Sequence, residues 1–395
     1  MAAPETAAVM AALGEARFVG GAVRNALLGT PVVDIDIAVP IAPEAAMARL
    51  KAAGLKVVET GLEHGTVTAI VGRHAFEVTS LRKDVETDGR HAVVAFTDDW
   101  AEDAARRDFT INALYASAAG EVFDYATGVE DLIAGRVRFM GDARTRIAED
   151  YLRILRLFRF HAWYGKGDLD TEALRAAAEA KDNLKSLSAE RIAKELLRLL
   201  EVGNPAPVLR VMAATGILSV LLPGALQLPR LDRLTEIEAE NLAPRDGVLR
   251  LAALLPDDEK GAHEVAEALK LSNTDRSRLE QALGGEALGR QISVPEARRL
   301  LYRMGPGRFR DKILLQWAGA AGGQSGAWRM LLEMAENWQR PRFALTGRDV
   351  MAAGVPQGPE VGRVLGAVEN WWIEGDFAAD EAACRDRLQM VIAGT

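Results

Sequence analysis

At 395 residues the chain is too long for one ordinary hydrophobic core, and its 49% apolar and 26% charged residues are typical of a globular protein with several domains. No apolar run reaches 18 residues and residues 1–16 carry no basic leader, so we expect no membrane span, no secretion signal and a cytoplasmic protein. A single cysteine, Cys384, excludes an intrachain disulfide, and the formal charge of −8, taken alone, argues against a nucleic-acid ligand.

The first 140 residues mix short β-type runs with turns. The predicted strands lie at Arg17–Val19, Val32–Val39, Thr66–Val71, Ala75–Leu81, Ala92–Phe96 and Glu121–Tyr125. Gly72 and Arg73 separate two of these strands and predict a hairpin turn. From about Gly141 onward amphipathic helices follow one another, and Ser188 is expected to cap one of them. Their breaks are expected at residues 203–205, 222–224, 255–256 and 318–326. The pattern predicts an α+β head followed by an all-helical remainder.

A glycine pair ends the first predicted strand. Residues 18–29, FVGGAVRNALLG, read as a strand, the pair Gly20-Gly21 and a short helix that carries Arg24 in its second turn. Such a turn lets backbone amides approach phosphates closely, with an arginine as charge partner. A glycine pair is also common in ordinary tight turns.

Two aspartates alternate along the second predicted strand. In residues 33–37, VDIDI, Asp34 and Asp36 are expected on one face, about 7 Å apart at Cα, while the isoleucines enter a core. Because like charges repel unless a cation lies between them, the pair fits a hard divalent ion, most simply Mg²⁺. Glu77 in the fourth predicted strand is a candidate third carboxylate, and three carboxylates on adjacent strands could hold the two ions used in phosphoryl transfer. The alternative is a solvated strand face, with Glu77 on the exposed side of a hairpin.

Two groups of arginines follow. Arg106 and Arg107 precede residues 108–114, which read as a helix. Residues 133–161 then hold four more basic than acidic side chains. The arginines of this basic stripe are Arg136, Arg138, Arg144, Arg146, Arg153, Arg156 and Arg159. Such a stripe can hold RNA on a protein that is acidic overall.

Taken together, these motifs resemble the bacterial CCA-adding enzyme and poly(A) polymerase family, the class II tRNA nucleotidyltransferases. The match covers about residues 17–200, in order and with family-like spacing. The motifs are GGAVR at 20–24, DID at 34–36, RRDFTINA at 106–113, DY at 124–125 with Gly128 and DL at 131–132, and EDYLR at 149–153.

The resemblance implies a polymerase β-like nucleotidyltransferase head with a mixed β-sheet at residues 1–140. All-α neck (141–203), body (204–320) and tail (321–395) domains follow, and the helical domains hold tRNA. It implies an enzyme that rebuilds the CCA end of tRNA from CTP and ATP, with Mg²⁺ on Asp34 and Asp36. Glu77 stays the candidate third catalytic carboxylate from its place on the predicted strand. The residues implied to bind nucleotide are Gly21, Arg24, Arg107, Asn112, Asp150, Arg153, Arg156 and Arg159. Asn25 stands where the family usually carries Asp, which predicts a changed supporting hydrogen bond or salt bridge. No protein partner is inferred.

The EDYLR motif suggests how a base could be chosen without a template. Asp150, Arg153, Arg156 and Arg159 recur every three residues on a predicted helix, so neighbours along the row lie close together. A carboxylate only accepts hydrogen bonds and a guanidinium only donates them. Cytosine and adenine offer an amino donor beside a ring-nitrogen acceptor, whereas uracil and guanine present the reverse, so an Asp150–Arg153 pair complements C and A. The alternative is a row of i,i+3 ion pairs on a solvated helix face.

Related activities share these motifs. A poly(A) polymerase or a partial enzyme that adds only CC or only A is the nearest alternative, and a non-catalytic RNA-binding protein is the alternative from another class. Retention of both aspartates of the DID motif argues against the last. The segment between Leu81 and Phe96 is expected to contain a loop whose Arg82, Lys83 and Arg90 are available to remodel the pocket between C and A, which favours full CCA addition.

Overall fold

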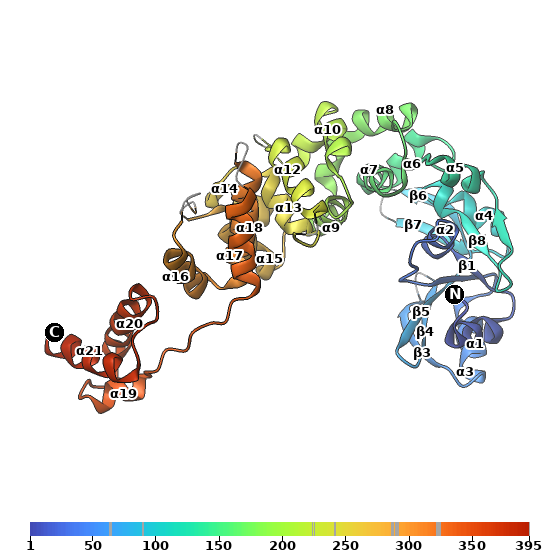
Figure 1. The fold of residues 1–395 in the computed structure, drawn as a ribbon. Helices are drawn as coiled ribbons and strands as arrows, with labels where there is room; N and C mark the ends of the chain where they lie inside the picture. Colours follow the sequence, from blue (N-terminus) through green and yellow to red (C-terminus); the bar gives the residue numbers. More distant parts are fainter. Residues whose placement is uncertain are drawn as a thin grey trace. The chain divides into compact units, whose positions relative to one another are not determined.

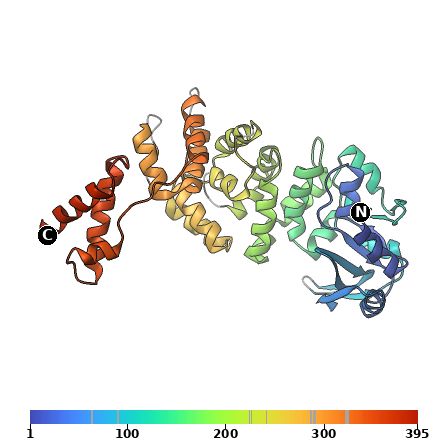
Figure 2. The ribbon, with the colours of Figure 1, turned by 60° about the horizontal axis from the view of Figure 1, so that its bottom comes forward.

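The computed structural model describes residues 1–62, 65–88, 91–222, 224, 226–240, 242–285, 288, 292–320 and 325–394; at 60, 84–88 and 91–94 it describes the backbone alone. The chain divides into two compact units, Met1–Gly224 and Ala225–Thr395. Strands lie in the N-terminal part of the first unit, and helices make up the second (Figure 1, Figure 2). The division into head, neck, body and tail stays a prediction.

A seven-stranded mixed sheet in the order β3-β4-β5-β2-β1-β8-β9 forms the centre of the first unit. Its strands are β1 (Arg17–Val19), β2 (Asp36–Val39), β3 (Lys56–Gly61), β4 (Thr66–Val71), β5 (His74–Ser80), β8 (Leu114–Ala116) and β9 (Val122–Asp124). The β2–β5 pair is parallel, whereas β1–β2, β1–β8, β3–β4, β4–β5 and β8–β9 are antiparallel. The β4–β5 hairpin turns at Gly72, as predicted, where a φ of +60° suits glycine.

Helices surround this sheet and continue beyond it. Those of the first unit are α1 (Pro4–Leu13), α2 (Gly21–Leu27), α3 (Pro43–Ala52), α4 (Trp100–Ala105), α5 (Gly128–Ala134), α6 (Ala143–Glu149), α7 (Leu152–Tyr164), α8 (Thr171–Ala180), α9 (Ala189–Leu200), α10 (Ala206–Ala214) and α11 (Ile217–Leu221), with 3₁₀ turns at Thr110–Asn112 and Lys181–Ser186. Helix α3 packs against β3, β4 and β5, and α7 packs against α9. Ser188 is the N-cap residue of α9, as predicted, although its side chain makes no capping hydrogen bond.

The second unit is helical in the part that the structure describes. Its helices are α12 (Leu228–Ala239), α13 (Gly247–Leu254), α14 (Glu259–Ala268), α15 (Asn273–Leu283), α16 (Val294–Met304), α17 (Pro306–Gly319), α18 (Ser325–Glu336), α19 (Gly347–Ala352), α20 (Pro359–Glu374) and α21 (Glu381–Ala393). A C-terminal core gathers Val350, Val364, Val368, Trp372, Cys384 and Leu388 from the last three helices, with Tyr302 of α16. None of the helices described here is long and apolar enough to cross a membrane.

The predicted strand at residues 32–39 starts later than expected. Strand β2 begins at Asp36, and Asp34 lies in a bend before it. Strand β1 pairs Phe18 with Ile37 and ends at Val19, where the glycine pair turns the chain into α2, so the residues before Asp36 find no partner on that side. The two aspartates therefore do not alternate along one strand, although Ile37 is fully buried, as expected.

Two other predicted elements are wrong. Residues 108–114 form no α-helix but a 3₁₀ turn that leads into β8, because Phe109 pairs with Phe139 in an antiparallel bridge and this long-range pairing overrides local helix propensity. The described part of the expected loop between Leu81 and Phe96 is instead a separate two-stranded sheet of β6 (Arg82–Asp88) and β7 (His91–Phe96), and β7 confirms the strand predicted at Ala92–Phe96. Arg90 lies outside the described residues.

Candidate active site

The glycine pair shapes one edge of the site. Strand β1 ends at Val19, Gly20 adopts φ +63° and ψ −118°, and α2 begins at Gly21. A Cβ on Gly20 would approach the carbonyl oxygen of Asn112 to 3.5 Å and Nη1 of Arg107 to 3.6 Å. The turn therefore needs glycine for its backbone conformation, and it lies directly against residues of the RRDFTINA motif.

Three carboxylates form a second edge, here called the carboxylate edge (Asp34, Asp36 and Glu77). In the parallel β2–β5 pair Asp36 is the register partner of Glu77, so the two occupy neighbouring positions on one face of the sheet. Asp36 is half-buried, whereas Asp34 and Glu77 are exposed. Burial raises the pKa of Asp36, the charges of Glu77 and Asp34 raise it further, and Arg107 opposes them. The edge thus concentrates like charge that a cation would relieve.

The carboxylate edge suits a divalent ion held partly by its substrate. Within the described ranges, no three or more carboxylate, imidazole or thiolate side chains converge on one ion position. Mg²⁺ is commonly bound through one or two carboxylates together with water and substrate phosphates. The all-oxygen donor set and the raised pKa of Asp36 fit that mode.

The side chain of Arg107 is oriented by the buried carboxylate of Asp103. Its Nη2 and Nε contact Oδ2 of Asp103 at 3.0 and 3.2 Å, and Nε donates to the Tyr115 hydroxyl at 3.0 Å. Burial raises the pKa of Asp103, but the charges of Arg107 and Arg106 and the hydrogen bond from Tyr115 outweigh burial and bring it to about 2. At neutral pH the charged Asp103 fixes Arg107 beside Gly20 and near the carboxylate edge.

A chain of polar contacts joins Arg24 to α7. The guanidinium of buried Arg24 donates to Oδ1 of Asn112, and Nδ2 of Asn112 donates to Oδ1 of Asp108 at 2.9 Å. Asp108 in turn accepts from Nε of Arg156 at 2.7 Å. Arg24 also donates to the Tyr164 hydroxyl at 2.8 Å and lies over its ring. The glycine turn and α7 therefore belong to one connected site.

Asn25 takes part in this chain without a charge. Its Oδ1 accepts from Nη2 of Arg24 at 3.1 Å and from the Tyr164 hydroxyl at 3.4 Å. The changed supporting bond that the sequence predicts is thus a neutral contact to Arg24. Burial lowers the pKa of Arg24, whereas Tyr164 raises it.

The arginines of α7, here called the arginine row (Arg153, Arg156 and Arg159), are all tied to acids. Arg153 pairs with Glu149, Arg156 with Asp108, and Arg159 with Glu195 of α9. Nη1 of Arg156 also lies 3.5 Å from Oε1 of Glu195. Burial raises the pKa of Asp108, but the charge of Arg156 and hydrogen bonds from Asn112, Arg156 and the Phe109 amide lower it overall. Because the partners lie on other elements and Arg159 is 9% exposed, the row is not a set of i,i+3 pairs on a solvated face.

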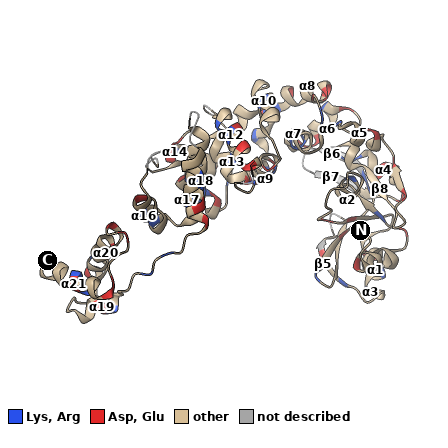
Figure 3. Ribbon diagram, viewed as in Figure 1, with Lys and Arg blue, Asp and Glu red and all other residues tan. Residues whose placement is uncertain are grey.

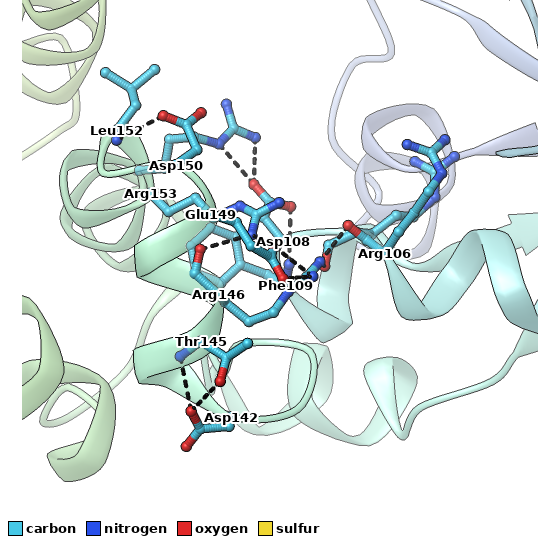
Figure 4. Close-up of polar contacts among 12 residues, drawn as sticks. Arg106, Asp108, Phe109, Asp142, Thr145, Arg146, Glu149, Asp150, Leu152 and Arg153 are labelled. Atoms are coloured by element: carbon cyan, nitrogen blue, oxygen red, sulfur yellow. Dashed lines mark hydrogen bonds and ion pairs between the residues drawn. The ribbon is translucent and has the colours of Figure 1, made fainter. Parts of the chain in front are cut away.

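Asp150 lies at the corner between α6 and α7 rather than on a helix. Its backbone is extended (φ −155°, ψ 105°), Oδ1 accepts from the Leu152 amide at 3.1 Å, and Oδ2 accepts from Arg191 at 2.6 Å. Arg153 points to Glu149 and to the carbonyl oxygen of Arg146, not to Asp150 (Figure 4). Asp150 therefore does not lie on the predicted helix row, and Asp150 and Arg153 are each held by other partners.

The basic stripe does not form a free basic face. All seven of its arginines make ion pairs, and the partners from outside the stripe are Asp108, Glu130, Asp131, Glu179 and Glu195. Blue and red segments both occur in this part of the ribbon (Figure 3). The excess of positive charge counted along the sequence is matched in space, which removes the argument that RNA binds there through charge alone.

Sequence reasoning missed the residues that hold the site together. Asp103, Asp108, Glu149, Tyr164 and Glu195 contact the predicted nucleotide-binding residues but were assigned no role. The sequence could have indicated Glu149, because it adjoins Asp150 in the EDYLR motif. The pairing of Glu195 with Arg159 spans 36 positions and leaves no local signal.

Comparison with known proteins agrees with this architecture. Residues 16–138 match the family model of the poly(A) polymerase head domain, and residues 168–228 match that of a probable RNA- and SrmB-binding site of polymerase A. The crystal structure of the Bacillus stearothermophilus CCA-adding enzyme in complex with CTP superposes with a TM-score of 0.79 at 28% identity, covering 99% of this chain and 97% of that one.

Two relatives are similar over nearly their whole length. The human mitochondrial CCA tRNA nucleotidyltransferase 1 is 32% identical over 388 residues, 93% of this chain and 85% of the relative. The CCA-adding enzyme of Levilactobacillus brevis is 31% identical over 402 residues, 97% and 96% of the two chains. With the glycine turn, the carboxylate edge and the arginine row in one unit, the chain belongs to the CCA-adding tRNA nucleotidyltransferase family.

Proposed function

We propose that this nucleotidyltransferase rebuilds the CCA end of tRNA without a template, using CTP and ATP and releasing pyrophosphate. The observation that carries the proposal is the contact chain from Arg24 through Asn112 and Asp108 to Arg156, which joins a phosphate-type glycine turn to a row of arginines. The names of the similar enzymes support CTP and tRNA as substrates, and the final A of a CCA end requires ATP. The cytoplasmic location stays a prediction from the sequence.

The phosphate end of the nucleotide is assigned to Gly21, Arg24 and Arg107. The backbone at the Gly20-Gly21 turn can come close to phosphate oxygens, and Arg107 is already oriented by Asp103 and Tyr115. A guanidinium placed in advance loses little side-chain entropy when it binds phosphate. Arg24 is more deeply buried and keeps the turn and Asn112 in place.

Asp34 and Asp36 are assigned to Mg²⁺, with Glu77 beside them. When bound there, the ion would favour ionisation of the attacking tRNA 3′-hydroxyl and offset the charge that develops on the α-phosphate. The chain's own part is to keep the carboxylates adjacent on β2 and β5 and to hold Arg107 near enough to act on the charge of Asp36. Attack of the hydroxyl on the α-phosphate then joins the new nucleotide to tRNA and expels pyrophosphate.

Base choice is assigned to Asp150 and Arg153, with Arg156 and Arg159 behind them. Asp150 can accept from the amino group of C or A, and Arg153 can donate to the ring nitrogen. Among the described residues Arg153 uses Nη1 for both of its contacts, so Nε and Nη2 remain as donors to a base. Asp108 and Glu195 hold Arg156 and Arg159 in the row.

The test is extension of a tRNA that ends at the discriminator base, with each NTP singly and in pairs and with product length read on a gel. CTP alone should add two nucleotides, CTP with ATP should add three, and UTP and GTP should add none. EDTA should stop the reaction and Mg²⁺ should restore it.

The alternatives give different ladders. A long ladder with ATP alone would identify a poly(A) polymerase, and a stop after CC in the presence of both nucleotides would identify a partial enzyme. Binding of tRNA without any extension would identify a non-catalytic RNA-binding protein. Each of these outcomes contradicts the proposal.

A further inference from the structure

Arg146 lies on α6, in the segment between the head motifs and the arginine row. Its side chain is buried, with 7% of the residue exposed, although it belongs to the basic stripe that was expected to face RNA. The guanidinium makes hydrogen bonds in two directions (Figure 4). One direction leads to the main chain at Arg107, and the other leads to the residue that holds Arg153.

In the first direction Arg146 caps the end of α4. Helix α4 ends at Ala105, so the carbonyl groups that follow lack partners within the helix. Nη2 of Arg146 donates to the carbonyl oxygen of Arg107 at 2.7 Å and also to that of Arg106. A cationic donor suits the negative end of a helix. The contact fixes the main chain from which the Arg107 side chain reaches toward Gly20 and Asp103.

In the second direction Arg146 holds Glu149. Nη1 lies 2.9 Å from Oε1 and 2.7 Å from Oε2 of that carboxylate. Glu149 also accepts from Nη1 of Arg153, and the same Nη1 donates to the carbonyl oxygen of Arg146 at 2.7 Å. Arg153 is thus placed both by the backbone of Arg146 and by the carboxylate that the Arg146 side chain holds.

We infer that Arg146 is a positioning residue for nucleotide selection, because it sets the place of Arg153 relative to Arg107. This inference rests on the proposed function, in which Arg107 binds phosphate and Arg153 reads the base. A nucleotide that contacts Arg107 with its phosphates and Arg153 with its base fits only if the distance between these two side chains stays constant. A displacement of about 1 Å at such a site can lower a rate by about a hundredfold.

The chemistry requires arginine at this position. A guanidinium presents donors on two nitrogens in a planar fork, so it can bond two carbonyl groups on one side and a carboxylate on the other. A lysine has one ammonium on a flexible stem and could keep the Glu149 contact or the carbonyl contacts, not both. Arg146→Lys therefore keeps the charge and the burial but breaks the link.

The matched control is Arg144, two residues earlier on the same helix. It is about half exposed and pairs with Glu179 on α8, away from Arg107 and Arg153. The Lys and Gln variants of Arg144 and Arg146 have the same changes in charge and volume. A difference between the two pairs therefore reports the position and not the type of substitution.

The experiment measures kcat/KM for CTP and for UTP on tRNA that ends at the discriminator base, with full-length protein. Thermal unfolding is followed by circular dichroism, and the assay temperature is chosen where each variant is folded. The quantity that decides is the ratio of the CTP value to the UTP value. A loss of folded enzyme lowers both values by the same factor and leaves this ratio unchanged.

We expect Arg146→Lys and Arg146→Gln to narrow the CTP preference by about tenfold or more, mainly through a lower kcat/KM for CTP. The Arg144 variants should stay within about twofold of the wild type, as for an exposed ion pair. Equal losses for CTP and UTP at Arg146 would overturn the inference, because they indicate support of the fold alone. Failure of both Arg146 variants to fold would overturn it for the same reason.

The inference and the proposed function fail differently. If the wild type adds no CTP to tRNA, the proposed function is wrong and the inference falls with it. If the wild type adds CTP selectively and the Arg146 variants keep the wild-type ratio, only the positioning role is wrong.

Discussion

The carboxylate edge and the arginine row differ in how their charges are balanced. At the carboxylate edge Asp36 lies beside Glu77 and near Asp34, and its pKa is raised by burial and by these like charges. In the arginine row each guanidinium already meets a carboxylate from another element. A bound cation would offset the like charges in the first region, whereas in the second each guanidinium already has a carboxylate partner before any ligand binds.

Under the proposed function, this contrast separates the residues for chemistry from the residues for base recognition. A region of unrelieved like charge gains free energy when a cation binds, which suits a step that needs a metal ion. A region of paired charges has little to gain from an added charge, but its side chains are held in defined positions, which suits the discrimination of hydrogen-bond patterns. Substitutions in the two regions should therefore affect different measurements.

The largest effect is expected at the carboxylate edge. Asp36→Ala should lower CTP addition by more than about a hundredfold, because it removes a carboxylate assigned to Mg²⁺ in the proposed function. The protein should remain folded: a carboxyl group whose pKa is raised in the folded state loses its stabilising contribution as pH rises through that pKa, so alanine removes a penalty at neutral pH. Gel assays of tRNA extension and metal-free thermal unfolding measure the two effects. If Asp36→Ala keeps activity within a few-fold of the wild type, the assignment of Asp36 to the metal ion is wrong.

The next largest effect is expected at the entrance to the arginine row. Asp150→Ala and Arg153→Ala should each narrow the preference for CTP over UTP by about tenfold to a hundredfold, because the reward for C and the penalty for U disappear together. Inhibition by pyrophosphate, which reports the phosphate end, should change less. The check is kcat/KM for all four NTPs on tRNA that ends at the discriminator base. A wild-type preference in Asp150→Ala would show that the corner residue does not read the base.

A smaller effect is expected behind Arg107, in stability rather than selection. The pKa of Asp103 is about 2, below its ordinary value, so its stabilising contribution is present at neutral pH and is lost as pH falls from about 4 through about 2. Asp103→Asn should cost about 2 kcal/mol at pH 7. Urea unfolding at several pH values should show the difference between the proteins shrinking below about pH 4. Asp182→Asn, in an exposed pair with Lys185, is the control and should change little.

The smallest effect is expected in the basic stripe. Arg136 is half exposed and pairs with Glu130 and Asp131, so Arg136→Gln should change tRNA affinity by less than about twofold. Filter binding at two salt concentrations measures this. A loss of tenfold or more with a reduced salt dependence would show that the stripe binds phosphate despite its ion pairs, and would break the comparison on the arginine side.

The sequence predicted the order of the elements better than their ends. Alternating or β-branched runs located β1, β4 and β5, and glycine and proline placed the breaks between helices. Strand β8, Leu114–Ala116, was hidden because its three residues are all buried and show no alternation. The start of β2 depends on where β1 stops pairing, which is a property of two distant segments.

The residues of the site were likewise predicted better than their partners. Gly21, Arg24, Arg107 and Asn112 lie together as the motifs suggested. What the motifs could not supply is the set of acids that neutralise the arginines, since Asp108 and Glu195 reach α7 through long-range packing. Charge counted along the sequence therefore overstated the basic character of residues 133–161.

The single thiol of the chain is a chemical probe of local opening in the C-terminal helices. Cys384 is 1% exposed within the core formed by Val350, Val364 and Trp372, and burial raises the pKa of its thiol. A thiol reagent can modify it only when these helices open, so the modification rate under native conditions reads their local opening free energy. Because the chain holds no other cysteine, this signal arises from the second unit alone. If tRNA slows the modification of Cys384, tRNA binding stabilises α19–α21. These helices lie far along the sequence from the residues assigned to catalysis.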